Sequence, residues 1–178
     1  MEPSKVEERL RAALNGGHLG LKATERAERL LSRLTSPVRL AVMGPRGAGK
    51  SSLLNVLAGS DVVPVDIKLP TLQLTWNEEA ETRCTYADGS KKTFISPKAR
   101  DLARDAPIFI EMERPLDVLQ QVAMLEVVMS GNINDQARAV TWATQRCDII
   151  VWCTQEFNEE EQSLWSRVPE AMRQHAFL

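Results

Sequence analysis

The sequence predicts an α/β fold of three layers, with a mostly parallel sheet between helices and two further helices ahead of it. Short apolar runs of strand length alternate with segments whose apolar residues recur at helical spacing. A glycine-rich turn joins the first of these runs to a helix, which is how an α/β unit opens. The length of 178 residues suits one domain with little left over.

The first 36 residues predict an N-terminal helical segment (1–36) made of two amphipathic helices. The first helix covers 4–14, and Ser4 and Glu7 have the spacing of a capping box at its start. A pair of glycines ends it, and the second helix runs from about 23 to 34. Each helix carries an apolar stripe, and such stripes require a partner surface.

Residues 37–178 predict the α/β domain itself. A buried strand over 38–43 leads through the glycine-rich turn into a helix over 50–57. Asp88-Gly89 predicts a hairpin turn between two strands. The other expected elements are strands at 72–76, 82–86, 92–95, 108–112, 123–129 and 149–153, and helices at 97–104, 135–146 and 159–175, the last kinked near Pro169.

Composition and charge exclude several classes of function. Lys plus Arg is 22 and Asp plus Glu is 24, a net charge of −2, so we expect no broad basic surface for nucleic acid. No apolar run approaches the roughly 20 residues that span a bilayer. The charged N-terminus lacks the apolar core of a signal peptide, which predicts a cytoplasmic protein. The three cysteines show no C-x-x-C spacing, which favours reduced thiols over a zinc site.

The chemistry of the chain is concentrated in the glycine-rich turn. Its sequence, Gly-Pro-Arg-Gly-Ala-Gly-Lys-Ser, fits the phosphate-binding pattern G-x-x-x-x-G-K-[ST] (Walker A) without a mismatch. The apolar strand before it and the helix after it are the context that the pattern requires. The lysine is expected to reach the β- and γ-phosphates and the serine to ligate magnesium. The expected nucleotide-binding residues are Gly44, Pro45, Arg46, Gly47, Ala48, Gly49, Lys50, Ser51 and Ser52.

The residues around this motif resemble the G domain of the dynamin superfamily, particularly its bacterial dynamin-like branch. The helix Lys-Ser-Ser-Leu-Leu-Asn-Val-Leu-Ala-Gly (50–59), the Val-Val-Pro-Val stretch at 62–65 and Pro70-Thr71 correspond to segments of that family. Further matches are Cys-Asp-Ile-Ile-Val-Trp at 147–152 and the C-terminal stretch 164–178. The resemblance covers nearly the whole chain and is strongest from 40 to 71. It implies a P-loop NTPase of G-domain type over 37–178.

The resemblance also implies a ligand set. It implies that Thr71 is the switch threonine, which together with Ser51 would complete a magnesium shell. It also implies that the bound ligand is GTP with Mg²⁺. Arg46 could act as a built-in arginine finger on transition-state charge, or be a solvated arginine near phosphate. Asn55, Leu53 and Leu54 are expected to be packing residues.

Three departures from the family pattern matter. The D-x-x-G magnesium motif, aligned on Gly131, has Val128 where the aspartate should be. Asp135 lies downstream and could in principle substitute for it, which is not the interpretation we favour. Glu126 is either an acid of the Walker B type or, as we favour, a strand residue facing a cap or a cation. Arg46 and Gly47 replace the glutamine and serine that dynamins carry near the attacking water.

The third departure is the absence of the guanine-reading [NT]-K-x-D motif, which follows the fifth strand in that family. Residues 176–178 look like the first residues of that strand. We therefore expect a C-terminally incomplete domain whose 149–153 strand lies at an open sheet edge.

Three functions stay open at this point. The leading one is a dynamin-like GTP-binding protein with weak or slow hydrolysis. A degenerate G domain that binds nucleotide without turnover is the second, and a P-loop ATPase or kinase is the third. Expected partners are guanine nucleotide and further copies of the chain, through the G domain or the N-terminal helices. Membrane contact is expected only through regions outside this chain.

Overall fold

The computed structural model describes residues 5–177, and its internal contacts divide the chain into two compact units, Met1–Ser36 and Pro37–Leu178. The first unit is a helical hairpin of α1 (Lys5–Asn15) and α2 (Leu21–Thr35), which pack against each other. Both predicted helices are therefore confirmed, while the predicted Ser4 cap lies outside the described residues. 

Most apolar side chains of the hairpin face solvent. Val6, Leu30 and Leu34 are exposed, and Ala27 is the buried residue of α2. An ion pair of 2.8 Å between Arg11 and Glu7, one turn apart, supports α1.

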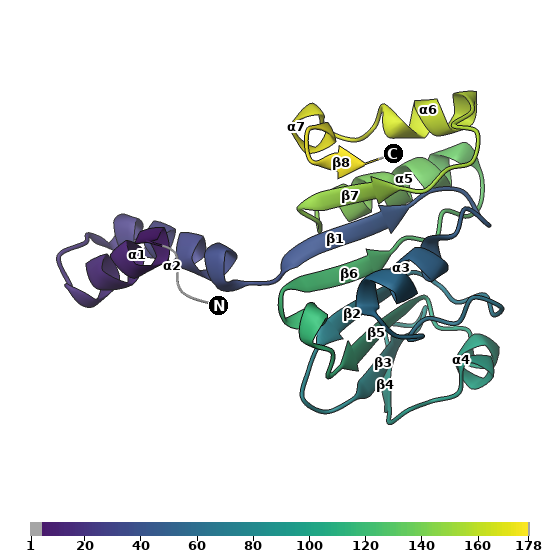
Figure 1. Ribbon diagram of the computed structural model, residues 1–178, viewed down its shortest axis with the longest axis horizontal. Helices are drawn as coiled ribbons and strands as arrows, with labels where there is room; N and C mark the ends of the chain where they lie inside the picture. Colours follow the sequence, from purple (N-terminus) through teal and green to yellow (C-terminus); the bar gives the residue numbers. More distant parts are fainter. Residues whose placement is uncertain (1–4, 178) are drawn as a thin grey trace. The chain divides into compact units, whose positions relative to one another are not determined.

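The second unit is built on one sheet with the strand order β4-β3-β5-β2-β6-β1-β7-β8 (Figure 1). Among the described strands, four pairings are parallel (β1–β6, β1–β7, β2–β5, β7–β8) and three are antiparallel (β2–β6, β3–β4, β3–β5). The predicted hairpin at Asp88-Gly89 is the β3–β4 pair. The strands are β1 (Val38–Met43), β2 (Leu72–Trp76), β3 (Glu81–Thr85), β4 (Lys91–Phe94), β5 (Phe109–Arg114), β6 (Val122–Glu126), β7 (Ile149–Trp152) and β8 (Ala176–Phe177).

Helices cover the two faces of this sheet, so the predicted three-layer α/β architecture is confirmed. Alternate residues of β1 face the two layers: Leu40 and Val42 join one core cluster with Leu54 of α3, while Ala41 and Met43 join the other. The first layer holds α3 (Lys50–Ala58), α4 (Ala99–Asp105) and the short 3₁₀ helix η1 (Asp117–Gln120), and the second holds α5 (Ile133–Thr144), α6 (Glu159–Trp165) and α7 (Glu170–Arg173).

Three expectations for the C-terminal half are corrected. The expected kinked helix over 159–175 is two helices, because Pro169 has no N–H to continue α6 and instead begins α7. The central strand β6 ends at Glu126 rather than at residue 129, and its two ladders with β1 and β2 both stop there. The strand β7 is not the sheet edge, because Ala176 pairs with Ile150 and continues the sheet as β8.

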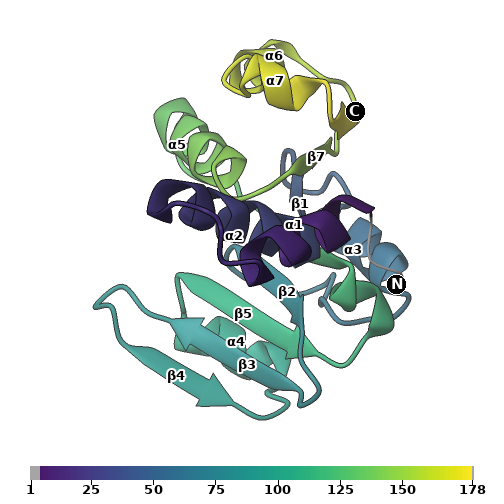
Figure 2. The ribbon, with the colours of Figure 1, turned by 90° about the vertical axis from the view of Figure 1, so that its left-hand side faces the viewer.

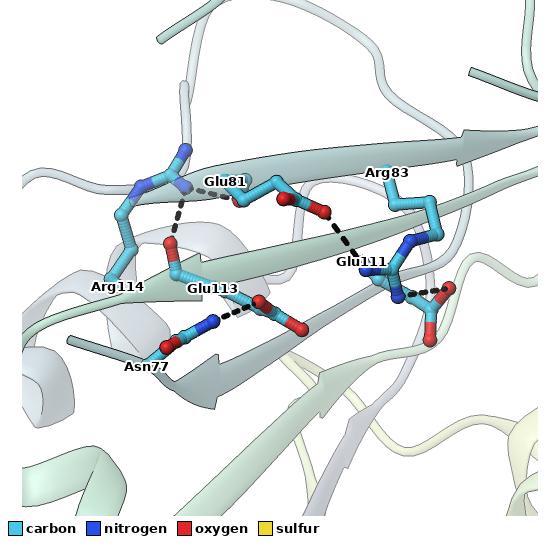
Figure 3. A network of polar contacts seen from close by, with 6 residues as sticks. All are labelled: Asn77, Glu81, Arg83, Glu111, Glu113 and Arg114. Carbon is cyan, nitrogen blue, oxygen red and sulfur yellow. Dashed lines mark hydrogen bonds and ion pairs between the residues drawn. The ribbon is translucent and has the colours of Figure 1, made fainter. Parts of the chain in front are cut away.

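The strands β2, β3 and β5 bury one face under the first helix layer and carry a polar network on the other. In Figure 2, α4 lies behind β3 and β5, so this second face is turned toward the viewer. Figure 3 shows the network: the Arg83 guanidinium lies 2.8 Å from the Glu81 carboxylate and 3.9 Å from that of Glu111. Arg114 donates hydrogen bonds to the backbone carbonyls of Glu81 and Glu113 at 2.8 and 2.7 Å, which fixes the start of β3 against the end of β5.

Candidate nucleotide site

The loop between β1 and α3 requires glycine at its first position. Gly44 has φ of 132°, and a Cβ added there would lie 1.9 Å from the carbonyl oxygen of Cys153, at the end of β7. Gly49, which caps α3, has φ of 86° in the left-handed region. The loop is thus closed tightly against the carboxyl ends of β1 and β7, the edge at which open α/β sheets bind ligands.

Lys50 folds back into this loop instead of extending into solvent. Its side chain is buried, and Nζ donates hydrogen bonds to the backbone carbonyls of Gly44 (3.0 Å) and Pro45 (2.8 Å). Burial lowers the pKa of Lys50, and the nearby carboxylate of Glu126 opposes that shift. The ammonium group therefore lies in the centre of the loop, at the positive N-terminal end of α3, where no side chain caps the helix.

Ser51, the next residue of α3, faces a buried carboxylate. Its Oγ donates a hydrogen bond of 2.9 Å to Oε1 of Glu126, the last residue of β6. Glu126 is 7% exposed, and its Oε2 has no hydrogen-bond partner among the described residues. Burial raises the pKa of Glu126, while Ser51 and Lys50 lower it. A buried carboxylate oxygen without a partner is rare in native structures, and it points to a cation or water that completes the site.

The carboxylate beside the loop is therefore that of Glu126. It does not come from the position that the alignment on Gly131 assigns to the aspartate. Val128, which that frame places at the aspartate position, contributes a backbone N–H that donates to Oγ1 of Thr71 at 3.1 Å. Asp135 caps the first turn of α5, where it accepts from the backbone N–H of Asn132 and pairs with Arg138. Glu126 is thus a strand residue near a cation, Lys50, as we favoured, and its contact with Ser51 is also the one expected of the alternative, an acid of the Walker B type.

A cavity of about 550 Å³ opens beside the loop. Of the expected nucleotide-binding residues, Arg46, Gly47, Gly49, Lys50, Ser51 and Ser52 line it, and Glu126, Val128 and residues 63–70 supply much of the remaining wall. Gly44, Pro45 and Ala48 shape the loop without lining the cavity. Thr71 is not part of the lining either, although Pro70 and Leu72 on either side of it are.

Two of the expected site residues differ in how they are held. The hydroxyl of Thr71 is engaged by Val128, so it is oriented toward the end of β6. Arg46 is exposed at the mouth of the cavity, and no hydrogen bond or ion pair holds its side chain in the described part of the chain. Arg46 is therefore free to reorient toward an anion, whereas the Thr71 hydroxyl is already held by one hydrogen bond.

Asn55 was expected to pack and instead forms hydrogen bonds. Its Nδ2 donates to the carbonyl of Val63 at 2.8 Å, and its Oδ1 accepts from the N–H groups of Val62 (3.1 Å) and Val63 (2.8 Å). The sequence holds a signal for this role, since Asn55 follows Ser51 by one helical turn and so shares its face of α3. The signal for Glu126 is that it is the one charged residue in the apolar run 122–129.

Comparison with known proteins supports the fold. No protein-family model matches the chain. It is similar to the isoniazid-induced protein IniC of Mycobacterium tuberculosis (strains CDC 1551 / Oshkosh and ATCC 25618 / H37Rv), with 26% identity over 158 residues that cover 79% of this chain and 32% of IniC. 

Two solved structures of an oligomerised bacterial dynamin pair, described as a mechanism for long-range sensing and tethering of membranes, are also similar. Their TM-scores are 0.55 and 0.56, at 18% and 16% identity, over 96% and 97% of this chain and 30% of theirs. The chain thus spans about a third of the length of the proteins it resembles. What these likenesses establish is the fold: residues 37–177 form an α/β domain of the kind found in the G domains of bacterial dynamins.

Proposed function

We propose that this chain binds a magnesium-nucleoside triphosphate, GTP by its resemblance to dynamins, in the cavity beside the 44–51 loop. The observation that carries the proposal is the contact of Ser51 with the buried Glu126 carboxylate, next to a lysine held inside a glycine loop. Backbone N–H groups at an uncapped helix N-terminus and a buried ammonium group are the donors that phosphate oxygens require.

The residues present fit a magnesium ion. Ser51 supplies a hydroxyl oxygen, Glu126 has an unpartnered carboxylate oxygen, and oxygen ligands are those that magnesium prefers. We propose that Ser51 would ligate the ion, that Glu126 would accept hydrogen bonds from water bound to it, and that Thr71 would supply a further hydroxyl oxygen. When bound, magnesium supplies charge neutralisation between the phosphates; the chain's own residues orient the nucleotide around it.

We further propose that hydrolysis is slow. Glu126 places a carboxylate beside Ser51, so the absence of an aspartate at Val128 no longer predicts slow hydrolysis. It follows from the residues at the loop itself, where Gly47 has no side chain to position water and Arg46 is exposed and unrestrained. Arg46 is proposed to recover part of the rate by approaching the γ-phosphate.

Guanine specificity, self-association and location remain proposals from the resemblance. Self-association would use the G domain or the exposed apolar residues of α1 and α2, such as Leu30 and Leu34. No helix among residues 5–177 has the length and apolarity to cross a bilayer. Membrane contact of the kind described for the bacterial dynamin pair is accordingly proposed only for regions outside this chain, and the chain itself is proposed to act in the cytoplasm.

Equilibrium titration of the chain with fluorescent GTP, GDP and ATP, each with magnesium and with EDTA, tests this proposal. We expect saturable binding of GTP that weakens when magnesium is removed, and single-turnover hydrolysis far slower than binding. Equal affinity for ATP would favour the ATPase or kinase alternative. Tight binding without any turnover would favour the non-hydrolysing module, and absence of binding would overturn the proposal.

A further inference from the structure

We propose that Asn55 is a positioning residue that anchors residues 62–70 over the phosphate site; this inference rests on the proposed function. The amide of Asn55 uses both its oxygen and its nitrogen on two consecutive residues, Val62 and Val63, through three hydrogen bonds. Both functional ends of one side chain are therefore committed to holding a short piece of backbone against α3.

In the described part of the chain, hydrogen bonds hold the segment that follows only at its two ends, and Leu69 near the far end packs against the core. Val63 is buried, so the near end is fixed by packing as well as by Asn55. At the far end, the Thr71 hydroxyl accepts from Val128 and the Thr71 carbonyl accepts from the N–H of Ile110. Between these anchors, residues 64–70 form no hydrogen bond with any other part of the described chain, and Val65 is 65% exposed.

This segment also lines the same cavity as the 44–51 loop. Residues 63–70 all line the cavity, together with Lys50 and Ser51. Asn55 lies one helical turn after Ser51, so the helix that carries the serine also carries the anchor of the cavity wall. A displacement of α3 at Ser51 would thus reach the start of the segment through one turn of the helix and the side chain of Asn55.

Without the hydrogen bonds of Asn55, the loop that is free to move extends from the segment back toward Gly59, where α3 ends. Ordering this longer loop when a γ-phosphate is bound costs more conformational entropy. The diphosphate is proposed to depend on the 44–51 loop, whereas the side-chain hydrogen bonds of Asn55 go to Val62 and Val63. The role of Asn55 is therefore selective: it supports binding of the triphosphate more than binding of the diphosphate.

The test compares Asn55→Ala and Asn55→Asp with Val56→Ala, a control that removes an exposed side chain from the next position of the same helix. Hydrogen exchange of the nucleotide-free protein measures the anchor directly. We expect the amide of Val63 to exchange at least about ten-fold faster in Asn55→Ala, since it loses its acceptor. The amide of Val62 should change less, because it also donates to the carbonyl of Ser60 at 2.9 Å. Asn55→Asp keeps the acceptor but loses the donor to Val63, so an intermediate rate is expected.

Binding supplies the second measurement. In Asn55→Ala we expect the affinity for magnesium and a non-hydrolysable GTP analogue to fall by about ten-fold, the equivalent of one net hydrogen bond, and the affinity for GDP to change by less than about two-fold. Unchanged exchange at 62–63, or equal losses for the two nucleotides, would overturn the positioning role. Absence of nucleotide binding to the unmodified chain would overturn the proposed function and the positioning role together, while the exchange data would still show whether Asn55 holds the segment.

Discussion

Replacing Glu126 by glutamine tests whether this residue contributes to magnesium binding at the candidate site. The variant keeps the shape of the side chain and an acceptor for Ser51, whose Oγ lies 2.9 Å from Oε1. It removes the charge that makes this hydrogen bond charge-assisted, a difference of about 1 kcal/mol or roughly five-fold in an equilibrium constant. It also replaces the unpartnered Oε2, the proposed acceptor for magnesium-bound water.

Loss of such an indirect metal contact typically weakens metal affinity by about 10–100-fold. We therefore expect the magnesium concentration at half-maximal GTP binding to rise by that factor in Glu126→Gln, measured by fluorescent nucleotide titration at fixed protein concentration. The thermal midpoint of the nucleotide-free protein should not fall, because a buried amide is less costly than a buried carboxylate.

Two further variants make the prediction specific. Glu111→Gln, a neutralised carboxylate on the polar face of β5 away from the cavity, should leave the magnesium requirement unchanged. Val128→Asp should not lower it, because the carboxylate position is already filled. An unchanged magnesium midpoint in Glu126→Gln, with a gain in Val128→Asp, would refute the placement of the acid at Glu126.

Two other predictions concern the loop and a buried thiol. Gly44→Ala should lower the free energy of unfolding in urea by about 1–3 kcal/mol more than Gly47→Ala does. Only the first substitution places a Cβ against backbone, 1.9 Å from the carbonyl oxygen of Cys153. Equal decreases in the two variants would contradict this close approach. Burial raises the pKa of Cys147 to about 11. At pH 8 the thiolate fraction of Cys147 should be about 100-fold below that of a thiol of pKa 9. The rate of its alkylation, followed by mass spectrometry, should therefore rise about ten-fold per pH unit toward pH 11. Rapid alkylation at pH 7 would contradict this.

The sequence predicts the elements of the fold well because their signals are local. The strand at 38–43 and the helix that begins at Lys50 are found within a residue of their predicted bounds, since apolar periodicity and a glycine turn mark both. The strand order is different in kind: β2 lies between β5 and β6, parallel to one and antiparallel to the other. That arrangement is decided by contacts between residues far apart in the chain, which no local pattern contains.

The candidate site divides in the same way. The position of the 44–51 loop between β1 and α3 could be predicted, because one continuous motif supplies both the glycines and the lysine. Glu126 could be noticed but not assigned, since its distance from Ser51 depends on where β6 ends. That end is set by the ladders to β1 and β2, whose last pairs join Glu126 to Val42 and to Leu72. Asn55 was misassigned for a similar reason: whether a helix residue packs or binds backbone depends on the loop that returns to it.

The most direct test of the account is the affinity of Lys50→Ala for a non-hydrolysable GTP analogue with magnesium, measured by isothermal titration calorimetry beside the unmodified chain. Lys50 is buried inside the loop, where its ammonium group donates hydrogen bonds to the carbonyls of Gly44 and Pro45. A phosphate bound by the loop would contact this positive charge. We predict one site per chain in the unmodified protein and a loss of roughly 1.5–3 kcal/mol, about one to two decades of affinity, in the variant. Equal affinity in the two proteins, with the variant still folded, would contradict the claim that this loop binds the nucleotide.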